Sequence, residues 1–407
     1  MTTKYARLYS SANGPSSPWR VTVGLEIHAQ LATPGKLFSQ APNRFGGTIN
    51  SDLEPFDVAL PGSQPRLNKH AILLAVRAAL AFGCNINRAS TFDRKHYFYP
   101  DQPAGYQITQ NYNALAHKGS FTLLERDGIE QSEQLTIGIS QLQVEQDTAR
   151  TTYHDSPPQS LVDLNRNGAP LIEIVTTPCI PSAKAAGAAL RKIQSILRAV
   201  QASDANMEAG GMRCDVNVSV TTEQDRHLGP SRRVEIKNLA SGRIVTDAVT
   251  AESARQIQVL ESGGTVGKET RGYDVDKRVT FTMRTKESAT DYRYMPEPDL
   301  RPVRLTDTFL DKCTANLPEL PDARLDRLLA APYHLTLKDA KVLQEDDARM
   351  AYYQGVLDVV GVAGNNAKTV CNWIVHELYG RQRVMSESGK TIHKVTTDQL
   401  GNLIKCV

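Results

Sequence analysis

The chain has 407 residues, 40% of them hydrophobic, which is enough for two or three domains with buried cores. No run of about eighteen apolar residues occurs, and this excludes a membrane-spanning helix and predicts no membrane insertion. The formal net charge is only +3, so a surface that is basic all over is excluded and any contact with nucleic acid must be local.

Residues 1–20 are basic and rich in serine, and they contain no acidic residue. This composition is typical of a mitochondrial targeting segment, although an ordinary disordered terminus has the same composition. The six cysteines are scattered and form no C-x-x-C pair, which predicts free thiols in a reducing compartment. We therefore expect a protein of the mitochondrial matrix.

The clearest local pattern is the alternation of apolar with polar or small residues in Val21–Leu31, which predicts a half-buried strand. Glu26 and His28 stand two positions apart and therefore on one face, about 7 Å apart along the strand. Their side chains can converge on one ion or reacting group. Any strand with one wet face carries polar residues there, however, so the pattern alone leaves open whether they are ligands or solvated surface.

Residues 35–66 are rich in Gly, Pro and Asn and predict an irregular connection, after which a helix begins at Asn68 and ends at Gly83. The stretch 91–110 then gathers aromatic rings next to Arg94 and Lys95. Rings and cations in this arrangement can stack a base and hold a phosphate. They also occur in ordinary packed corners, and the composition does not decide between the two.

Two strands are predicted at Leu135–Ile139 and Leu142–Asp147, and two more within Ser160–Val175, where Asn167-Gly168 is a strong turn signal. In the last of these strands Glu173 shares a face with apolar neighbours. A carboxylate in such surroundings requires a partner.

Further helices and strands follow with clear periodicity. The predicted helices are Ser182–Gln201 and Ala248–Glu261, and the predicted strands are Met212–Val220, Arg233–Asn238 and Arg278–Arg284. The polar faces of the first two strands present Arg213 and Lys237, which either pair across neighbouring strands or face a ligand. Because helices and strands do not alternate regularly, the order of elements predicts an α+β fold with an antiparallel or mixed sheet and covering helices.

The composition changes near residue 300, where prolines become frequent and strand patterns give way to short helices. We expect an all-α domain with helices at Leu337–Asp346, Asp347–Val359, Asn366–Tyr379 and Thr397–Lys405. The predicted organisation is a targeting segment at 1–20, a catalytic cradle domain at 21–300, a proline-rich connector at 301–322 and a helical domain at 323–407.

Seven strings, in the order GLEIHAQL, FDRKHYFYPDQPAGYQITQ, LVDLNRNGAPLIEIV, MRCDVNVSV, EIKNLAS, ETRGYD and DYRYMPEPDL, run through most of the chain. Together they resemble the B subunit of the tRNA-dependent amidotransferases. The resemblance implies an ATP-dependent ligase that phosphorylates the glutamyl carboxylate of mischarged Glu-tRNA(Gln) and amidates it with ammonia, giving Gln-tRNA(Gln). It also implies an amidase (A) subunit that supplies the ammonia and a small third subunit.

The resemblance also implies a site. Glu26, His28 and Glu173 match catalytic and metal-binding positions, and Mg²⁺ suits them because it prefers oxygen ligands and bridges phosphate oxygens. A fourth metal position matches Gln146, where bacterial relatives have an acid, so this ligand would offer a carbonyl oxygen without a charge. The groups expected to bind substrate or the tRNA end are His96, Tyr97, Tyr99, Arg213 and Lys237.

The sequence departs from the family pattern in two other places. The stretch 38–60 lacks the cysteine cluster of many bacterial relatives, and we expect no zinc there. The tail domain expected after the helical domain is absent, so either the sequence is truncated or tRNA binding has passed to a partner, and the ending LIKCV, which breaks off a helical pattern without a cap, favours truncation. A second hypothesis for the function is therefore a subunit without chemistry that only holds the amidase or the tRNA, and Mg²⁺-dependent ATP turnover separates the two.

Overall fold

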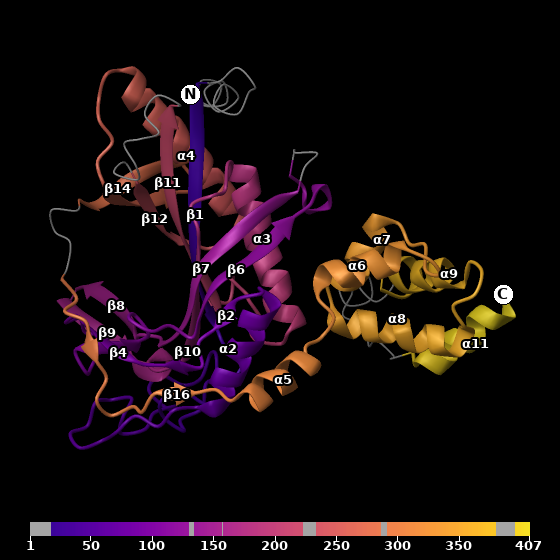
Figure 1. Cartoon of the computed structure of the whole chain (residues 1–407), viewed down its shortest axis with the longest axis horizontal. Coiled ribbons are helices and arrows are strands. Elements are labelled where there is room, and N and C mark those ends of the chain that lie inside the picture. The colour runs from indigo at the N-terminus through magenta and orange to yellow at the C-terminus, as the bar shows by residue number, and fades with distance from the viewer. Residues whose placement is uncertain (1–17, 130–133, 157, 223–232, 286–290, 380–394) are drawn as a thin grey trace. The chain divides into compact units, whose positions relative to one another are not determined.

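The computed structural model describes residues 18–129, 134–156, 158–222, 233–285, 291–379 and 395–407. The chain divides into two compact units, Met1–Leu317 and Pro318–Val407, and each is described by itself (Figure 1). The predicted α+β fold class is confirmed by a large mixed sheet with covering helices. The predicted targeting segment lies outside the described residues except for its last three positions. Among the described residues, no helix is both long and apolar enough to cross a membrane.

The first unit is built on a sheet of nine strands with β1 near its centre. In spatial order the strands are β14 (Val279–Thr285), β13 (Glu269–Asp274), β12 (Val234–Leu239), β11 (Met212–Thr222), β1 (Trp19–Gln30), β10 (Pro170–Thr176), β7 (Leu135–Gln146), β6 (Ala116–Leu123) and β2 (Asn85–Ile86). All neighbours are antiparallel except β12 and β13, which run parallel. The sheet is therefore mixed.

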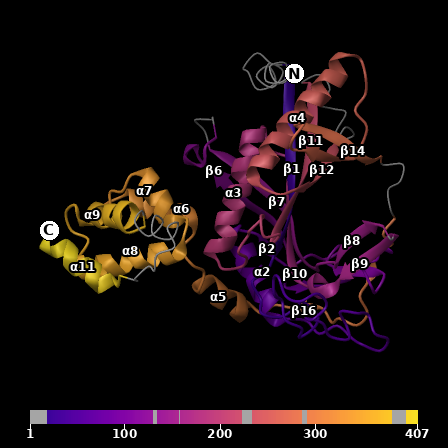
Figure 2. The same cartoon turned by 180° about the vertical axis from the view of Figure 1, so that it is seen from behind.

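Three helices cover the apolar face of this sheet: α2 (Lys69–Ala81), α3 (Ala183–Ala199) and α4 (Gly242–Glu261). Both views show α3 and α4 next to each other (Figures 1 and 2). Each helix begins after a polar residue that caps it, Asn68, Ser182 or Ser241. The helix predicted from Ala248 starts six residues earlier, because the Ser241 hydroxyl accepts a hydrogen bond from the Ile244 amide.

Strand β7 is continuous where the sequence predicted two strands. Its register against β10 shifts, so that Val175 lies opposite Gln141 and Thr176 opposite Ile139, which leaves Ser140 as an extra residue. A β-bulge of this kind reverses the alternation of side chains along a strand. This explains why the two apolar patterns are out of phase in the sequence although the strand does not break.

Strand β13 was not predicted from the sequence. It is short and polar and has Gly272 at its middle, so it lacks the apolar alternation of its neighbours. A Cβ at this position would lie 2.4 Å from the ring of Phe281 on β14, so a larger residue here would displace that ring. The close approach of that ring covers the backbone of β13.

Five shorter strands and a hairpin of the first unit lie outside the nine-stranded sheet. Strand β4 (Asp93–His96) pairs with β5 (Tyr106–Thr109) and with β15 (Met295–Pro296). Strand β3 (Ala89–Ser90) pairs with β16 (Val303–Arg304). The hairpin consists of β8 (Arg150–Asp155) and β9 (Pro158–Asp163). The Arg94 guanidinium donates to both carboxylate oxygens of the buried Glu297, at 2.7 and 2.9 Å. The segment after residue 290 is thus held against β4, about 200 residues away in sequence.

The expected connector at 301–322 is partly helical, since α5 (Asp307–Ala315) lies in it and packs on α2. The remaining short elements of the first unit are η1 (Glu125–Asp127) and η2 (Leu164–Arg166). The second unit contains α6 (Pro321–Leu329), α7 (Leu337–Gln344), α8 (Asp347–Val360), α9 (Asn366–Asn372), η5 (Trp373–Leu378) and α11 (Thr397–Cys406). Its core is apolar around the fully buried Tyr353, whose hydroxyl donates to the Ala367 carbonyl.

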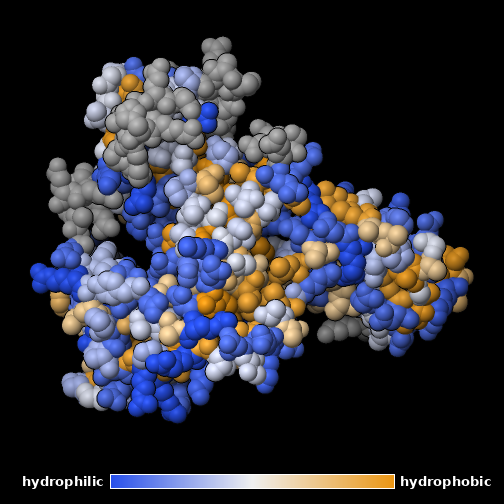
Figure 3. Space-filling view, in the orientation of Figure 1, coloured by the Kyte–Doolittle hydropathy of each residue, from blue (hydrophilic) through white to orange (hydrophobic). Residues whose placement is uncertain are grey.

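The surface of the first unit is mostly polar in the view of Figure 3, with apolar residues gathered near its centre. Along strand β1 the apolar side chains are buried, while Glu26 and His28 on its other face remain partly accessible. The opposite, polar face of the sheet is therefore where a site can form.

Candidate active site

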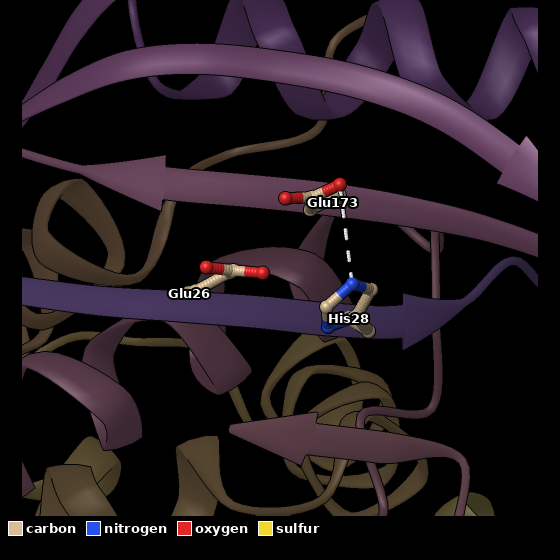
Figure 4. Close-up of side chains that lie close together, drawn as sticks. All are labelled: Glu26, His28 and Glu173. Carbon is tan, nitrogen blue, oxygen red and sulfur yellow. Dashed lines mark ion pairs between the residues drawn. The ribbon is translucent and has the colours of Figure 1, made fainter. Parts of the chain in front are cut away.

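The site is built on the polar face of the sheet, from side chains that strand register brings together. His28 on β1 lies directly opposite Glu173 on β10, and the His28 Nε2 atom is 3.9 Å from a Glu173 carboxylate oxygen. Glu26 stands two residues before His28 on the same face. One ligand atom from each of the three residues lies within 4.8 Å of the others (Figure 4).

Glu145 joins these three side chains, and Gln146 does not. The Glu145 carboxylate lies 3.2 Å from His28 Nε2, the shortest contact that this imidazole makes with a carboxylate. Gln146 is opposite Pro170 in the ladder and therefore points to the other face of β7. The structure thus separates Gln146 from the other sequence-predicted ligands, because neighbouring positions on a strand face opposite ways. We call Glu26, His28, Glu145 and Glu173 the acidic cluster.

Neutral side chains hold two of these carboxylates. The Thr109 hydroxyl on β5 donates to Glu145 at 3.2 Å, and the Gln143 amide donates to Glu173. Gln143 also donates to the Thr109 hydroxyl, at 3.2 Å. These hydrogen bonds fix the orientation of Glu145 and Glu173 without supplying a positive charge, so the cluster retains its negative charge.

The electrostatics of the acidic cluster reflect three carboxylates around one imidazole. Burial alone would lower the pKa of His28, but the hydrogen bond to Glu145 and the charges of Glu145 and Glu173 raise it to about 9. Burial opposes the charge of Glu145 as well, yet His28 holds the pKa of that carboxyl below its ordinary value. The His28–Glu145 pair is therefore ionised at neutral pH.

The remaining two carboxyls are short of positive charge. Burial and the neighbouring charge of Glu145 raise the pKa of Glu173 to about 8. Burial raises the pKa of Glu26 too, against the attraction of His28 and Lys237. Carboxyls that are hard to ionise in the absence of a cation are typical of sites that bind one.

The donor set and its spacing fit a divalent cation. Ligands around one Mg²⁺ at about 2.1 Å lie at most about 4.2 Å apart, and the three donors are within 4.8 Å of one another. Shifts of less than about 1 Å would bring them into one coordination sphere. Two carboxylates and one imidazole form a mostly hard, oxygen-rich set, which suits Mg²⁺ or Mn²⁺.

The two basic residues predicted on this face both have carboxylate partners. Arg213 donates to Asp147 at 2.8 Å, and Lys237 lies 2.7 Å from Asp215 and 3.1 Å from Glu235. Lys237 therefore pairs across neighbouring strands with Asp215, whereas the partner of Arg213 follows β7, a strand that is not a neighbour of β11. An ammonium has three donors, so Lys237 keeps one beyond these two partners.

The predicted aromatic residues border a cavity of about 630 Å³. We call it the tyrosine cavity, and its walls include Lys95, Tyr97, Tyr99, Asp101, Lys237 and Tyr292. His96 is not among its lining residues, because its Nδ1 contacts the Arg293 carbonyl at 2.9 Å and its ring packs near Tyr106. The structure therefore brings Tyr97, Tyr99 and Lys237 together and separates them from His96 and Arg213.

Two residues at these sites, Glu145 and Tyr292, were not predicted from the sequence, whereas Lys95 was indicated as a cation beside the aromatic rings. A signal for Glu145 was present, since Leu142 and Val144 are apolar and the residue after Val144 must face the other way. Tyr292 had no local signal. It reaches the cavity because His96 donates its amide hydrogen to the Tyr292 carbonyl, at 2.9 Å.

Comparisons with known proteins give a consistent result. Residues 21–311 match the family model of the GatB/GatE catalytic domain. The B subunit of the mitochondrial glutamyl-tRNA(Gln) amidotransferase of Talaromyces stipitatus is 45% identical to this chain, over 96% of the chain and 69% of the relative. The protein of the same name from Ajellomyces dermatitidis is 48% identical, over 89% of the chain and 63% of the relative. The chain thus spans about two thirds of the length of these relatives.

Proposed function

The chain belongs to the GatB/GatE catalytic domain family, and we infer from this membership that it is the B subunit of a tRNA-dependent glutamyl amidotransferase. Such an enzyme is a ligase of protein biosynthesis, and the fungal relatives are named as mitochondrial proteins. The chain is assigned to the mitochondrion with them. Its substrate is mischarged Glu-tRNA(Gln), and its product is Gln-tRNA(Gln).

The reaction requires activation because a carboxylate does not accept ammonia directly. The γ-carboxylate of the glutamyl group attacks the terminal phosphorus of ATP, ADP leaves, and an acyl phosphate forms. Ammonia then attacks the acyl carbon and phosphate leaves with the bonding electrons, which yields the amide. Family membership implies the use of ATP.

The acidic cluster supports an assignment of this chemistry to Glu26, His28 and Glu173. A Mg²⁺ ion bound there would neutralise and orient phosphate oxygens. Glu26 and Glu173 supply carboxylate oxygens and His28 supplies a ring nitrogen, while Glu145 orients the imidazole through its carboxylate. Gln146, which faces away, is not assigned to the metal. The single observation that carries the proposal is the convergence of three donors within 4.8 Å on the polar face.

The tyrosine cavity supports the assignment of Tyr97, Tyr99 and Lys237 to substrate binding. Aromatic rings stack bases, and the spare donor of Lys237 can meet a phosphate or carboxylate. Arg213 and His96 have protein partners, and in this proposal they orient neighbouring groups. Arg213 does so by holding Asp147.

Membership of a multi-subunit amidotransferase implies partner subunits. As partners of this chain we propose an amidase subunit, which releases ammonia from glutamine, and a small third subunit that stabilises the pair. Ammonia must reach the acidic cluster without loss to water, so the amidase would dock where a path to the polar face exists.

The test is amide formation on Glu-tRNA(Gln) by the chain co-purified with its amidase partner, with ATP, Mg²⁺ and ammonium chloride in place of glutamine. Ammonium bypasses the glutaminase, so product assigns the activation and transfer steps to this chain. Omission of ATP or Mg²⁺ should abolish product. A folded complex that binds tRNA but gives no product would support the alternative, a subunit that only holds its partners.

A further inference from the structure

A small cavity is lined by Gln146, the residue that faces away from the acidic cluster. Its volume is about 10 Å³, which is about the space that one water molecule or one ion of similar size requires. Its walls come from four segments that are far apart in the sequence: residues 56–57, residues between 102 and 106, Gln146 at the end of β7, and residues 167–168 before β10. We call it the amide cavity.

Three side-chain amides of the amide cavity carry an oxygen without a hydrogen-bond donor. Gln102 Oε1, Gln146 Oε1 and Asn167 Oδ1 are all buried and receive no hydrogen bond from the described part of the chain. The three residues are at most 6% exposed. Buried acceptors are nearly always satisfied in folded proteins, so three of them around one cavity indicate a bound species that meets them all.

Two of these amides have a fixed orientation. The Gln102 Nε2 atom donates to the Tyr106 carbonyl, and the Asn167 Nδ2 atom donates to the Asp57 carbonyl at 2.5 Å. Only the nitrogen of an amide can donate to a carbonyl, so an exchange of nitrogen and oxygen would place two acceptors against each other. At Gln102 and Asn167 the buried atom that needs a partner is therefore an oxygen.

A carboxylate adds negative charge to the lining. Asp57 Oδ1 accepts a hydrogen bond from the Ser39 hydroxyl at 3.0 Å, and it borders Gly168, where a Cβ would lie 2.9 Å from it. The other carboxylate oxygen is 3.4 Å from the ammonium of the completely buried Lys36. Burial raises the pKa of Asp57 although Lys36 opposes this. The lysine therefore leaves this carboxyl short of positive charge.

The donor set distinguishes a cation from a water molecule. A water molecule has two hydrogens, so it leaves at least one of three acceptors unsatisfied, whereas a cation can contact all three oxygens at once. Three neutral oxygens and one carboxylate shared with a lysine carry too little charge for a divalent ion, which usually takes several carboxylates. Neutral carbonyl oxygens do bind K⁺ in channel filters, where they replace its hydration shell.

Among the alkali cations, K⁺ fits the amide cavity better than Na⁺ or Li⁺. It is close in size to the single water molecule that such a cavity can hold. It also loses its hydration shell at a lower cost than the two smaller ions, and a set of mostly neutral oxygens offers little to offset a high cost.

We propose that the amide cavity binds one K⁺ ion, with Gln102 Oε1, Gln146 Oε1 and Asn167 Oδ1 as ligands and Asp57 as the neighbouring negative charge. The ion would connect the four segments that line the cavity. It gives Gln146 a role on the face of β7 opposite the acidic cluster. The inference goes beyond the proposed function and does not depend on it, because it concerns a second cation at a separate place.

Hydrogen exchange measured by mass spectrometry tests the site in the complex of the chain with its partner subunits. The complex is compared in KCl and in LiCl at equal concentration, without ammonium, which resembles K⁺ in charge and size. At a K⁺ concentration about ten times the dissociation constant, exchange should slow about 10-fold in the peptides that line the amide cavity. Peptides of the second unit should exchange equally in both salts.

Two variants of Gln146 test the ligand. Gln146→Leu has a similar volume without the oxygen, and the difference between KCl and LiCl should fall below about 2-fold. Gln146→Glu keeps an oxygen and adds a charge, so the difference should be retained or become larger. If Gln146→Leu does not fold, Gln146→Glu and the diffraction experiment below still test the proposal.

Gln344→Leu is the matched control. The Gln344 Oε1 atom on α7 is also buried and receives no hydrogen bond from the described residues, but this residue belongs to the second unit and does not line the amide cavity. The K⁺ response of the first unit should be the same in this variant as in the wild type. Co-purification with the partner subunits verifies that each variant is folded.

Diffraction locates the ion directly. Rb⁺ replaces K⁺ at sites of this kind and scatters anomalously, so crystals of the complex grown in RbCl should show an anomalous peak in the amide cavity. A water molecule in the cavity without such a peak would overturn the inference. Equal exchange of the lining peptides in KCl and LiCl would also overturn it, as would a K⁺ response that persists in Gln146→Leu.

Discussion

Two groups of buried charges in the first unit differ in whether their charges balance. Behind the sheet, Glu252 on α4 is completely buried, and each of its carboxylate oxygens receives at least two hydrogen bonds, from Arg255, Gln256 and Thr280. Arg271 on β13 adds a further cation at 3.4 Å. We call this group the α4 network. On the polar face, the acidic cluster sets three carboxylates against one imidazole.

The difference indicates which group is structural and which is functional. In the α4 network every acid meets a guanidinium or a neutral donor, so the network requires no ligand. In the acidic cluster burial raises the pKa of Glu26 and Glu173, and the charge of Glu145 raises that of Glu173 further, so that a proton or a bound cation stabilises these carboxyls. Removal of a carboxylate should therefore lower stability in the α4 network and lower activity in the acidic cluster.

The largest effect is expected from Glu173→Ala or Glu26→Ala in the acidic cluster. Loss of either carboxylate removes a metal ligand, and amide formation should fall by about 10³-fold or more, equal to about 4 kcal/mol of transition-state stabilisation. Glutaminase activity of the complex should stay within about 2-fold. In the absence of metal, the free energy of unfolding should change by less than about 1 kcal/mol, because the substitution also removes a carboxylate that repels its neighbours. Loss of both activities, or of neither, would contradict this assignment.

Glu252→Ala should give the converse result in the α4 network. It leaves the Arg255 and Arg271 guanidinium groups without their shared carboxylate, and we expect a loss of about 3 kcal/mol in unfolding free energy. Denaturant titration measures this loss. At a temperature where the variant is folded, amide formation should remain close to the wild type. Glu252→Gln, which keeps the shape of the side chain and removes its charge, is the matched control. Its free energy of unfolding should lie between those of the wild type and Glu252→Ala. A variant as stable as the wild type would show that the network is dispensable.

Glu145 and Gln146 are adjacent and provide an internal comparison. Glu145→Gln removes the anion that holds His28, and amide formation should fall about 10- to 100-fold, as for other groups that orient a metal ligand. Gln146→Glu, on the opposite face, should change activity by less than about 3-fold. Steady-state kinetics with varied Mg²⁺ separates the two, because only Glu145→Gln should raise the Mg²⁺ requirement. A larger effect from Gln146→Glu would contradict the strand register described above.

The smallest predicted effect is the dependence of metal affinity on pH. His28, with a pKa of about 9, and Glu173, with a pKa of about 8, both carry protons that a cation must displace. Affinity for Mn²⁺ should therefore rise with pH, most steeply below pH 8 and by about tenfold between pH 8 and pH 9, and level off above pH 9. Mn²⁺ titration by electron paramagnetic resonance measures it. In Glu145→Gln the pKa of His28 falls and the slope should flatten. An affinity independent of pH would exclude His28 as a ligand.

Much of the fold could be predicted from the sequence where one side of an element is buried. Strand β1 and helices α2 and α3 were predicted close to their observed bounds, since apolar periodicity and polar capping residues are local properties. Strand β13 and the short strands around β4 were not, because they have few buried side chains and form through pairing with distant segments. Their sequences carry no periodicity to detect.

The acidic cluster, too, could be predicted from the sequence only in part. Glu26 and His28 could be predicted to share a face, and the family strings added Glu173. The choice between Gln146 and Glu145 required the observed register of β7, because the bulge at Ser140 determines on which face of the sheet every later side chain of this strand lies. The pairing of Lys237 with Asp215 was likewise left open by the sequence and decided by the bulge in β12.

The sequence by itself determined the family, the α+β class and the two residues at the centre of the site. Those depend on residue identity and on spacing along one strand. The tertiary structure alone decided which acid completes the cluster and that Tyr292 packs beside Tyr97 in the lining of a cavity. The physical reason is that Arg94 and Glu297, 203 positions apart, form a buried ion pair that returns a distant segment to β4. No local pattern specifies a contact over such a separation.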